Sequence, residues 1–271
     1  MGNTCASRDK PTDPSLSPVN SSLPYEENRL RYGQYKAEYV SDQTPLAMLT
    51  RFEAKLPLVK IDIDEFERRL KKLANEQTGD YLSETQIVES FKDSLALKDI
   101  TVAGSVVRQV LLDDTLKDKK KKGFLIPNIL LLANMYCPSN PGLRAQKFFE
   151  LCQENLDPQI SANDKELKQL FMKMLEYSYV FIIRVYKANM VQGQDATIDN
   201  AWIPDEDKLE EIYDQMYEEF QDAVFKSKSK DSREEFLEEL KEGNKCWLQP
   251  HFLRQQIFAK LTGSGKSPTS K

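Results

Sequence analysis

Apolar side chains recur every three or four residues along most of this chain, which is the repeat of helices that bury one face. One such stripe runs from Ile63 to Leu73 and follows Asp62, whose carboxylate suits a helix start. The clearest stripe runs from Leu209 to Val224, directly after an acidic segment at 205–207 where carboxylates favour the helix dipole. Strand-like alternation over a useful length is absent from the sequence. The pattern therefore predicts an all-α fold.

Two more apolar segments complete the predicted helical body. Residues 167–174 and 180–185 predict one long apolar helix. Pro250 suits the first turn of a last helix, whose apolar side includes Leu253 and Ile257. Helices thus account for the chain from about residue 45 onward.

The two ends of the chain differ in composition from this body. Residues 1–44 are rich in Ser, Thr, Asn and Pro and lack the aliphatic density that offsets the entropy of ordering, so they predict a disordered tether. Residues 262–271 are dominated by Gly, Ser and Lys and predict a disordered tail.

Three breaks between helices share one local pattern, in which a Ser is followed three residues later by Gln, Asp or Glu. Such a Ser accepts a bond from a free backbone N–H of the helix, and the later side chain reaches back to the N–H of the Ser. We predict a helix start at each Ser. The three pairs are Ser83 with Gln86, Ser161 with Asp164, and Ser232 with Glu235.

The residue before each of these Ser residues adds a second signal. It is apolar in the first two breaks, Leu82 and Ile160, and is Asp231 in the third. A helix, a loop, one apolar residue and a helix start with a final acid is the layout of an EF-hand. The chain therefore resembles the four-hand calcium sensors of the recoverin, frequenin and calcineurin B group. Residues 130–175 look most like their passage from second to third hand, and residues 204–240 are similar to their fourth hand.

This resemblance covers roughly residues 45–245 and implies a domain organisation. It implies EF-hand-like pairs at 45–140 and 141–245, each with helix-loop-helix units joined by a short loop bridge. An extra C-terminal helix is expected at 246–261.

The resemblance also implies a partner, because paired hands leave an apolar groove that accepts an amphipathic helix. Candidates for lining it are Phe171, Met172, Met174 and Phe181, although such residues equally suit a plain core. The groove is expected to be either permanently open or filled by the terminal helix around residues 253–261.

A calcium loop needs oxygen ligands at its positions 1, 3, 5 and 12, and a Gly at position 6. With Leu82 at position 8, the first loop ends on Gln86, an amide that cannot clamp calcium through two carboxylate oxygens. With Gly123 and Leu125 at positions 6 and 8, the second loop presents lysines at ligand places. The fourth loop, at 225–232, has alternating lysines as well.

Weak ligand candidates occur in the third loop alone. They are Asn155, Asp157 and Asp164, but Pro158 stands where the Gly belongs. We expect no bound metal or other cofactor, with weak calcium binding at this loop as the alternative.

The amino terminus suggests lipid attachment. Removal of Met1 exposes Gly2, and Cys5 follows, which resembles the acylated ends of calcineurin B and recoverin-type sensors. Ala6 departs from the myristoylation pattern, which has Ser or Thr there, and an unmodified start is the alternative. One myristoyl chain binds a membrane marginally, so palmitate on Cys5 would be the second anchor. We expect a location at the cytoplasmic face of a membrane, or in the cytoplasm.

Charge and composition exclude several other functions. Acidic side chains exceed basic ones by 43 − 38 = 5, which disfavours nucleic acid as a partner. The apolar run at 124–136 is shorter than the roughly 20 residues that span a bilayer. The four cysteines form no C-x-x-C pair, and one histidine, His251, leaves little for zinc binding or acid–base catalysis. Cys137, Cys152 and Cys246 are interpreted as packing residues.

These observations predict a membrane-anchored, non-catalytic adaptor or regulatory subunit that binds a helical segment of another protein, largely without calcium. Two alternatives remain open. One is a structural, cytoskeleton-associated assembly protein that does not reside at membranes. The other is a calcium sensor with one residual site.

Overall fold

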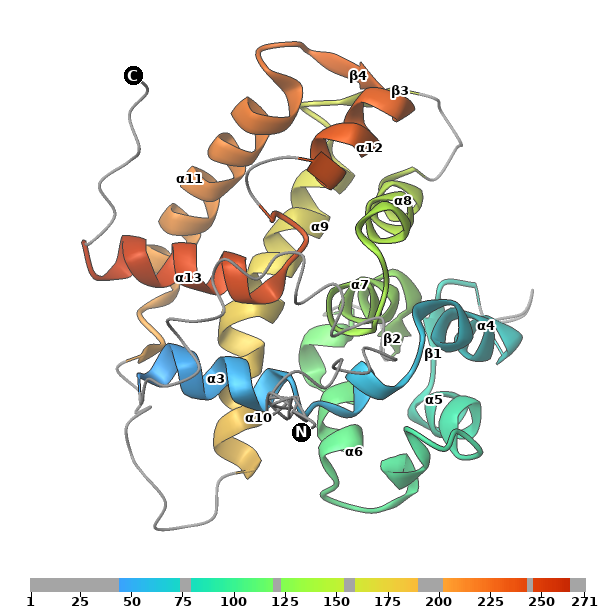
Figure 1. Ribbon diagram of the computed structural model, residues 1–271. Coiled ribbons are helices and arrows are strands. Elements are labelled where there is room, and N and C mark those ends of the chain that lie inside the picture. Colours follow the sequence, from blue (N-terminus) through green and yellow to red (C-terminus); the bar gives the residue numbers. More distant parts are fainter. Residues whose placement is uncertain are drawn as a thin grey trace, which may run out of the picture.

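A computed structural model of the protein describes residues 44–73, 79–118, 123–153, 159–189, 202–242 and 246–263. Over these ranges the predicted all-α class is confirmed, and the strands form two short antiparallel pairs (Figure 1). In the same ranges, each helix is too short or too polar to cross a membrane. The tether and tail predicted at the chain ends lie almost entirely outside the described residues.

The first half of the body contains short helices around one strand pair. Its elements are α3 (Pro45–Glu53), η2 (Pro57–Lys60), α4 (Ile63–Leu73), β1 (Tyr81–Leu82), α5 (Glu84–Phe91), η3 (Lys98–Thr101), α6 (Val106–Leu111), η4 (Asp114–Leu116), β2 (Phe124–Leu125) and α7 (Ile126–Tyr136).

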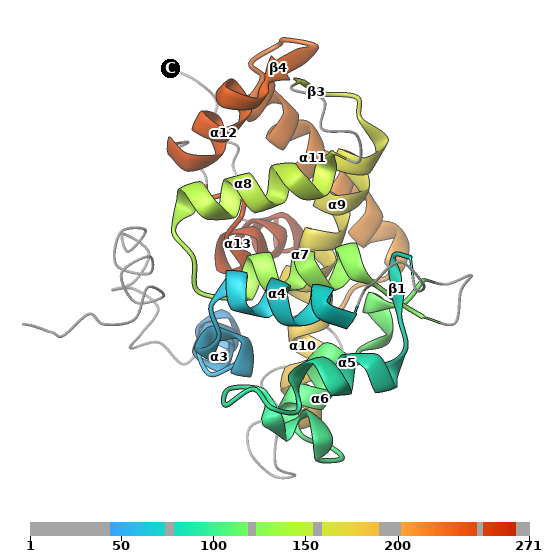
Figure 2. The same cartoon turned by 90° about the vertical axis from the view of Figure 1, so that its right-hand side faces the viewer.

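The second half has longer helices around the other pair (Figure 2). Its elements are α8 (Pro141–Cys152), β3 (Gln159–Ser161), α9 (Lys165–Glu176), the π-helical turn η5 (Tyr177–Phe181), α10 (Ile182–Asn189), α11 (Glu206–Phe225), β4 (Lys230–Ser232), α12 (Arg233–Glu242) and α13 (Pro250–Leu261).

Two of the three predicted helix starts have the expected capping bonds. Ser83 and Gln86 form a complete capping box at α5. At α12, the Ser232 backbone N–H donates to Glu235 Oε2 at 3.0 Å, and the Glu235 N–H donates to Ser232 Oγ at 3.3 Å. Both starts follow directly from their sequence pattern.

The start predicted at Ser161 is wrong. Helix α9 begins at Lys165, and its N-cap is Asp164, whose Oδ1 accepts from the N–H groups of Glu166 and Leu167 at 2.8 and 3.3 Å. Ser161 instead belongs to β3, so its backbone is extended by strand pairing. Asp is as strong an N-cap as Ser, and the helix therefore starts at the later position.

Each strand pair joins two loops at the residues before the helix starts. Ile160 of β3 lies opposite Asp231 of β4, as the shared pattern predicts. In the other pair Leu82 lies opposite Phe124, so the prediction that Leu125 is its counterpart is wrong by one residue. Side chains alternate between faces along a strand, and Phe124 is the buried one, 3% exposed, whereas Leu125 is half-buried.

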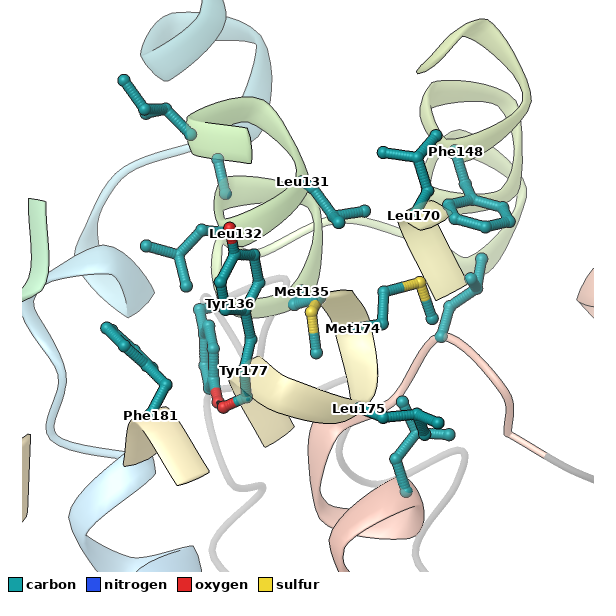
Figure 3. Packing of buried hydrophobic residues seen from close by; sticks show 14 of the residues in the cluster. Leu131, Leu132, Met135, Tyr136, Phe148, Leu170, Met174, Leu175, Tyr177 and Phe181 are labelled. Atoms are coloured by element: carbon teal, nitrogen blue, oxygen red, sulfur yellow. Dashed lines mark hydrogen bonds between the residues drawn. The ribbon is translucent and has the colours of Figure 1, made fainter. Parts of the chain in front are cut away.

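One apolar core runs through both halves of the body, with buried members from Leu49 to Ile257. Helix α7 contacts α4 of the first half and α8 and α9 of the second. Met135 of α7 and Met174 of α9 are both buried members of this core (Figure 3). The two predicted pairs therefore share their packing rather than forming separate cores.

The π-helical turn η5 interrupts what was predicted as one long helix from 167 to 185. Its wider turn leaves backbone carbonyls free for side chains of neighbouring helices. The Tyr136 hydroxyl on α7 donates to the carbonyl of Tyr177 at 2.9 Å, and Arg254 Nη1 on α13 donates to that of Ser178 at 3.1 Å. The interruption thus fixes α7 and α13 to the same point.

Two neighbouring residues on α9 test this packing. Phe171 is fully buried against Phe220 and Trp247, with ring centroids 4.5 and 5.9 Å away, whereas Met172 is half-buried. Phe171→Ala should lower the free energy of unfolding by about 3–5 kcal/mol, measured by urea denaturation. Met172→Ala, the matched control, should cost about 1 kcal/mol. Equal costs for the two variants would contradict this packing.

Candidate functional site

In the first two loops, an amide side chain takes position 12, where a calcium loop has a carboxylate. In the first loop, Gln86 Oε1 accepts from the backbone N–H of Ser83 at 2.8 Å and therefore serves the helix cap. In the second loop, Phe124 pairs with Leu82 and therefore takes position 8. Position 12 then falls on Asn128. The Asn128 side chain is buried and donates to the Leu116 carbonyl at 3.4 Å.

The weak calcium candidates of the third loop are only partly described. Asn155 and Asp157 lie outside the described residues, and the Oδ1 atom of Asp164 caps α9. Within the described ranges, His, Cys, Asp and Glu side chains form no group of three or more that could hold a metal.

The fourth loop contains a lysine ammonium bound to loop carboxylates. With Asp231 at position 8, Lys228 falls at position 5 and Glu235 at position 12. Lys228 Nζ lies 2.9 Å from Glu235 Oε1 and 3.4 Å from Asp231 Oδ1. The ammonium thus pairs with the carboxylate that would clamp the ion in a calcium loop.

The backbone of this loop is strained and is held by neighbouring contacts. Lys226 and Ser227 have φ values of 48° and 70°, a left-handed conformation that costs non-Gly residues roughly 1–3 kcal/mol each. The Lys228 N–H donates to the Phe225 carbonyl at 2.8 Å, and Lys226 forms an ion pair with Glu239 on α12. Both lysines therefore tie the turn to the exit helix.

This ion pairing shifts the pKa values of Glu235 and Lys228. The hydrogen bond from Lys228 lowers the pKa of Glu235 to about 2, helped by bonds from the Ser232 backbone and hydroxyl. The same bond raises the pKa of Lys228. Burial raises the pKa of Asp231, partly offset by Lys228. Glu235 and Lys228 are thus both ionised at neutral pH.

The residues predicted to line a partner groove lie inside the protein in this structure. Phe171, Met174 and Phe181 are fully buried, and Met172 is half-buried. Helix α13 packs over this region, in contact with α3, α9, η5 and α11 (Figure 1). The groove itself stays a prediction, and the structure shows that α13 covers this region. We call the surface of α3, α9, η5 and α11 beneath α13 the helix seat.

A buried arginine anchors α13 in the helix seat. Arg254 is 1% exposed, and its Nη2 lies 2.5 Å from Glu53 Oε2 and 3.2 Å from Thr50 Oγ1, both on α3. Its Nη1 donates to the Ser178 carbonyl of η5. Removing one partner of a buried ion pair costs roughly 3–5 kcal/mol, because the other charge is left stranded.

Aromatic and polar contacts hold the rest of the terminal segment. The ring of Trp247 lies 5.8 Å from that of Phe252, and Trp202 stacks on Phe258 with centroids 4.8 Å apart. Lys260 Nζ lies 2.6 Å from Glu219 Oε1 on α11. Helix α13 is therefore anchored at both ends as well as at Arg254.

Three of the cysteine thiols have surroundings that do not favour a nucleophilic role. Burial raises the pKa of the Cys137, Cys152 and Cys246 thiols, and the first two are fully enclosed. A raised thiol pKa disfavours the nucleophilic thiolate. His251 is half-buried in the first turn of α13.

The sequence reasoning missed the roles of Arg254 and Lys228. An arginine between Leu253 and Ile257 on an apolar helix was the available signal for a buried charge. The alternating lysines at 225–232 leave the fourth loop without a ligand set, but the sequence alone does not show that Lys228 pairs with Glu235. Gly2 and Cys5 lie outside the described residues. Comparisons with protein families, curated proteins and solved structures found no match to this chain.

Replacing Lys228 by Met should raise the pKa of Glu235 from about 2 toward the ordinary value near 4.3, because only the Ser232 bonds then lower it. The folded pKa lies below the unfolded one. The ion pair therefore stabilises the fold above the ordinary carboxyl range, and this contribution is lost as the pH falls toward 2. A carbon-detected NMR titration of the Glu235 carboxyl measures the change.

The control for this titration is Lys230→Met. It removes the same charge from an exposed residue of β4, two residues after Lys228. It should leave the Glu235 pKa nearly unchanged. A shift of equal size in both variants would mean that general charge, rather than the Lys228 contact, sets the acidity of Glu235.

Proposed function

We propose that this protein is a non-catalytic, EF-hand-like adaptor or regulatory subunit that binds a helical segment of a partner protein without needing calcium. The observation that carries the proposal is the helix seat, where four elements pack around the terminal helix α13, which is anchored by a buried arginine. A surface that holds one such helix has the shape and chemistry to hold another.

The strand pairs support the likeness to paired EF-hands. Each pair joins two loops that lead into helices, Leu82 with Phe124 and Ile160 with Asp231, although α9 begins only at Lys165. This connection sets the relation between the helices on either side of the loops. It is the feature that a helix-binding, four-hand scaffold requires.

Independence from calcium is supported by the charges of the loops. Lys228 pairs with Glu235 and Asp231, and Lys117, at position 1 of the second loop, lies 2.6 Å from Asp114. A bound divalent cation would have to displace or approach these ammonium groups, at a cost in Coulomb energy. A calcium sensor using the third loop remains the alternative on this point.

Membrane attachment through acyl groups on Gly2 and Cys5 belongs to the same proposal. A dual lipid anchor would place the helix seat at the cytoplasmic face of a membrane, where partner helices are held nearby. The competing function is a structural, cytoskeleton-associated assembly protein that has no membrane residence. The net charge of the chain is −5, which disfavours nucleic acid as a partner.

Partner binding is tested by capture on the immobilised full-length chain, in chelator and in excess calcium. Ile257→Asp in α13 should increase the amount of helix-containing partner retained, because a fully buried apolar contact of the resident helix is lost. The half-buried control Gln256→Ala should retain as much as the native chain. The proposal predicts equal retention with and without calcium. Retention only in calcium would favour the sensor, and no partner with any variant would contradict the proposal.

Membrane residence is tested by cell fractionation of a Gly2→Ala variant. An acylated adaptor should move from the membrane fraction to the supernatant. The variant lacks the myristoyl group, and stable attachment takes two lipid signals. The control Asn3→Ala should stay with the membranes. Equal sedimentation of the native chain and the Gly2→Ala variant would favour the structural assembly protein.

A further inference from the structure

We propose that residues 29–40, the tyrosine segment, dock on an apolar patch at the surface where α11 begins and α13 ends. The apolar patch consists of four half-buried side chains, those of Trp202, Ile203, Phe258 and Leu261. The occupant is thus a part of the same chain, and the docking does not depend on the adaptor function.

The side chains of the apolar patch are held in place but are not enclosed. Trp202 stacks on Phe258 with ring centroids 4.8 Å apart and an interplanar angle of 14°, so this contact covers one face of the indole. The Trp202 carbonyl accepts a bond from the Tyr179 hydroxyl at 2.7 Å, which fixes the backbone ahead of α11. Leu261 lies three residues after Phe258 and therefore on the same side of α13. An ordered apolar surface of this kind favours a further apolar side chain that covers it.

The chain enters the described body near the apolar patch. Helix α3 begins at Pro45, and α13 contacts both α3 and α11. In Figure 1 the first turn of α3, the last turn of α13 and the start of α11 lie on the same side of the molecule. Residues 41–43 can span roughly 10 Å when extended, which lets the tyrosine segment reach this side. A segment tethered in this way acts at an effective concentration on the order of millimolar, so even weak contacts hold it.

The tyrosine segment has side chains that suit the apolar patch. Tyr32, Tyr35 and Tyr39 are three and four residues apart, so a helical conformation would present their rings on one side. A tyrosine ring covers a large apolar area while its hydroxyl stays in water. Three such rings match a patch of aromatic and aliphatic side chains that lies at the surface.

Charge favours the same contact. The tyrosine segment contains Arg29, Arg31 and Lys36 but only one acidic residue, Glu38, which gives it a net charge of 3 − 1 = 2. Beside the apolar patch, the start of α11 carries exposed carboxylates, those of Asp205, Glu206, Asp207 and Glu210. Opposite charges attract the tyrosine segment to this face. A second copy of the chain that docked face to face would bring its own carboxylates against these, which disfavours a symmetric dimer.

The test measures the exposure of Trp202 in the full-length chain by NMR, with a soluble gadolinium chelate as the probe. In a variant with Tyr32→Ser, Tyr35→Ser and Tyr39→Ser, paramagnetic relaxation of the Trp202 side-chain signals should rise at least two-fold, because the covering rings are lost. The native chain should also show nuclear Overhauser effects between tyrosine rings and the Leu261 methyl groups. The triple variant should lose them.

Two controls accompany the triple variant. Tyr25→Ser removes the fourth tyrosine of the first 43 residues and should leave the relaxation of Trp202 as it is in the native chain. Trp247, which is 2% exposed, is the internal reference. Its signals should stay unchanged in every variant, because the substituted residues all precede the described body.

Three results would overturn the inference: equal relaxation of Trp202 in the native chain and the triple variant, Overhauser effects that survive in the triple variant, or an equal effect of Tyr25→Ser. Relaxation of Trp202 that falls as the protein concentration rises would assign the apolar patch to a second copy of the chain instead. Failure of the adaptor function is recognised separately, because it abolishes partner capture and leaves the exposure of Trp202 unaffected.

Discussion

The buried guanidinium of Arg254 is the interaction on which the arrangement of the helices depends. It joins α3 near the start of the body, the π-helical turn η5 in the middle and α13 near the end. The turn makes this junction possible, because its wider backbone offers the Tyr177 and Ser178 carbonyls to α7 and α13. Segments separated by some two hundred residues thus meet at one polar point inside an apolar core, and a polar point of this kind fixes a unique arrangement.

The loops apply the same principle at the surface, with a lysine where an ion would act. Lys228 supplies positive charge to Glu235 and Asp231, and the strained backbone at Lys226 and Ser227 is tied to α12 by these contacts. A covalently attached cation cannot be removed by a chelator. The fourth loop is thus held in one state by contacts within the chain.

The helices could be predicted from the sequence because their signals are local. The stripe from Leu209 to Val224 and its acidic start define α11, and the Ser83 and Ser232 caps define α5 and α12. The helix start predicted at Ser161 is wrong because strand pairing prevails over capping there. The register predicted at Leu125 is wrong because Phe124 is the residue that is buried. The roles of Arg254 and Lys228 depend on groups far away in the chain or across a turn, and one sequence does not reveal which charges meet.

If Lys228 holds the fourth loop in place of an ion, added calcium should leave that loop unchanged. Titration of the full-length protein with calcium, followed by amide NMR, tests this most directly. We expect the amides of β4 and α12 to keep their chemical shifts up to millimolar calcium. Saturable shifts at micromolar calcium, centred on residues 225–235, would contradict it.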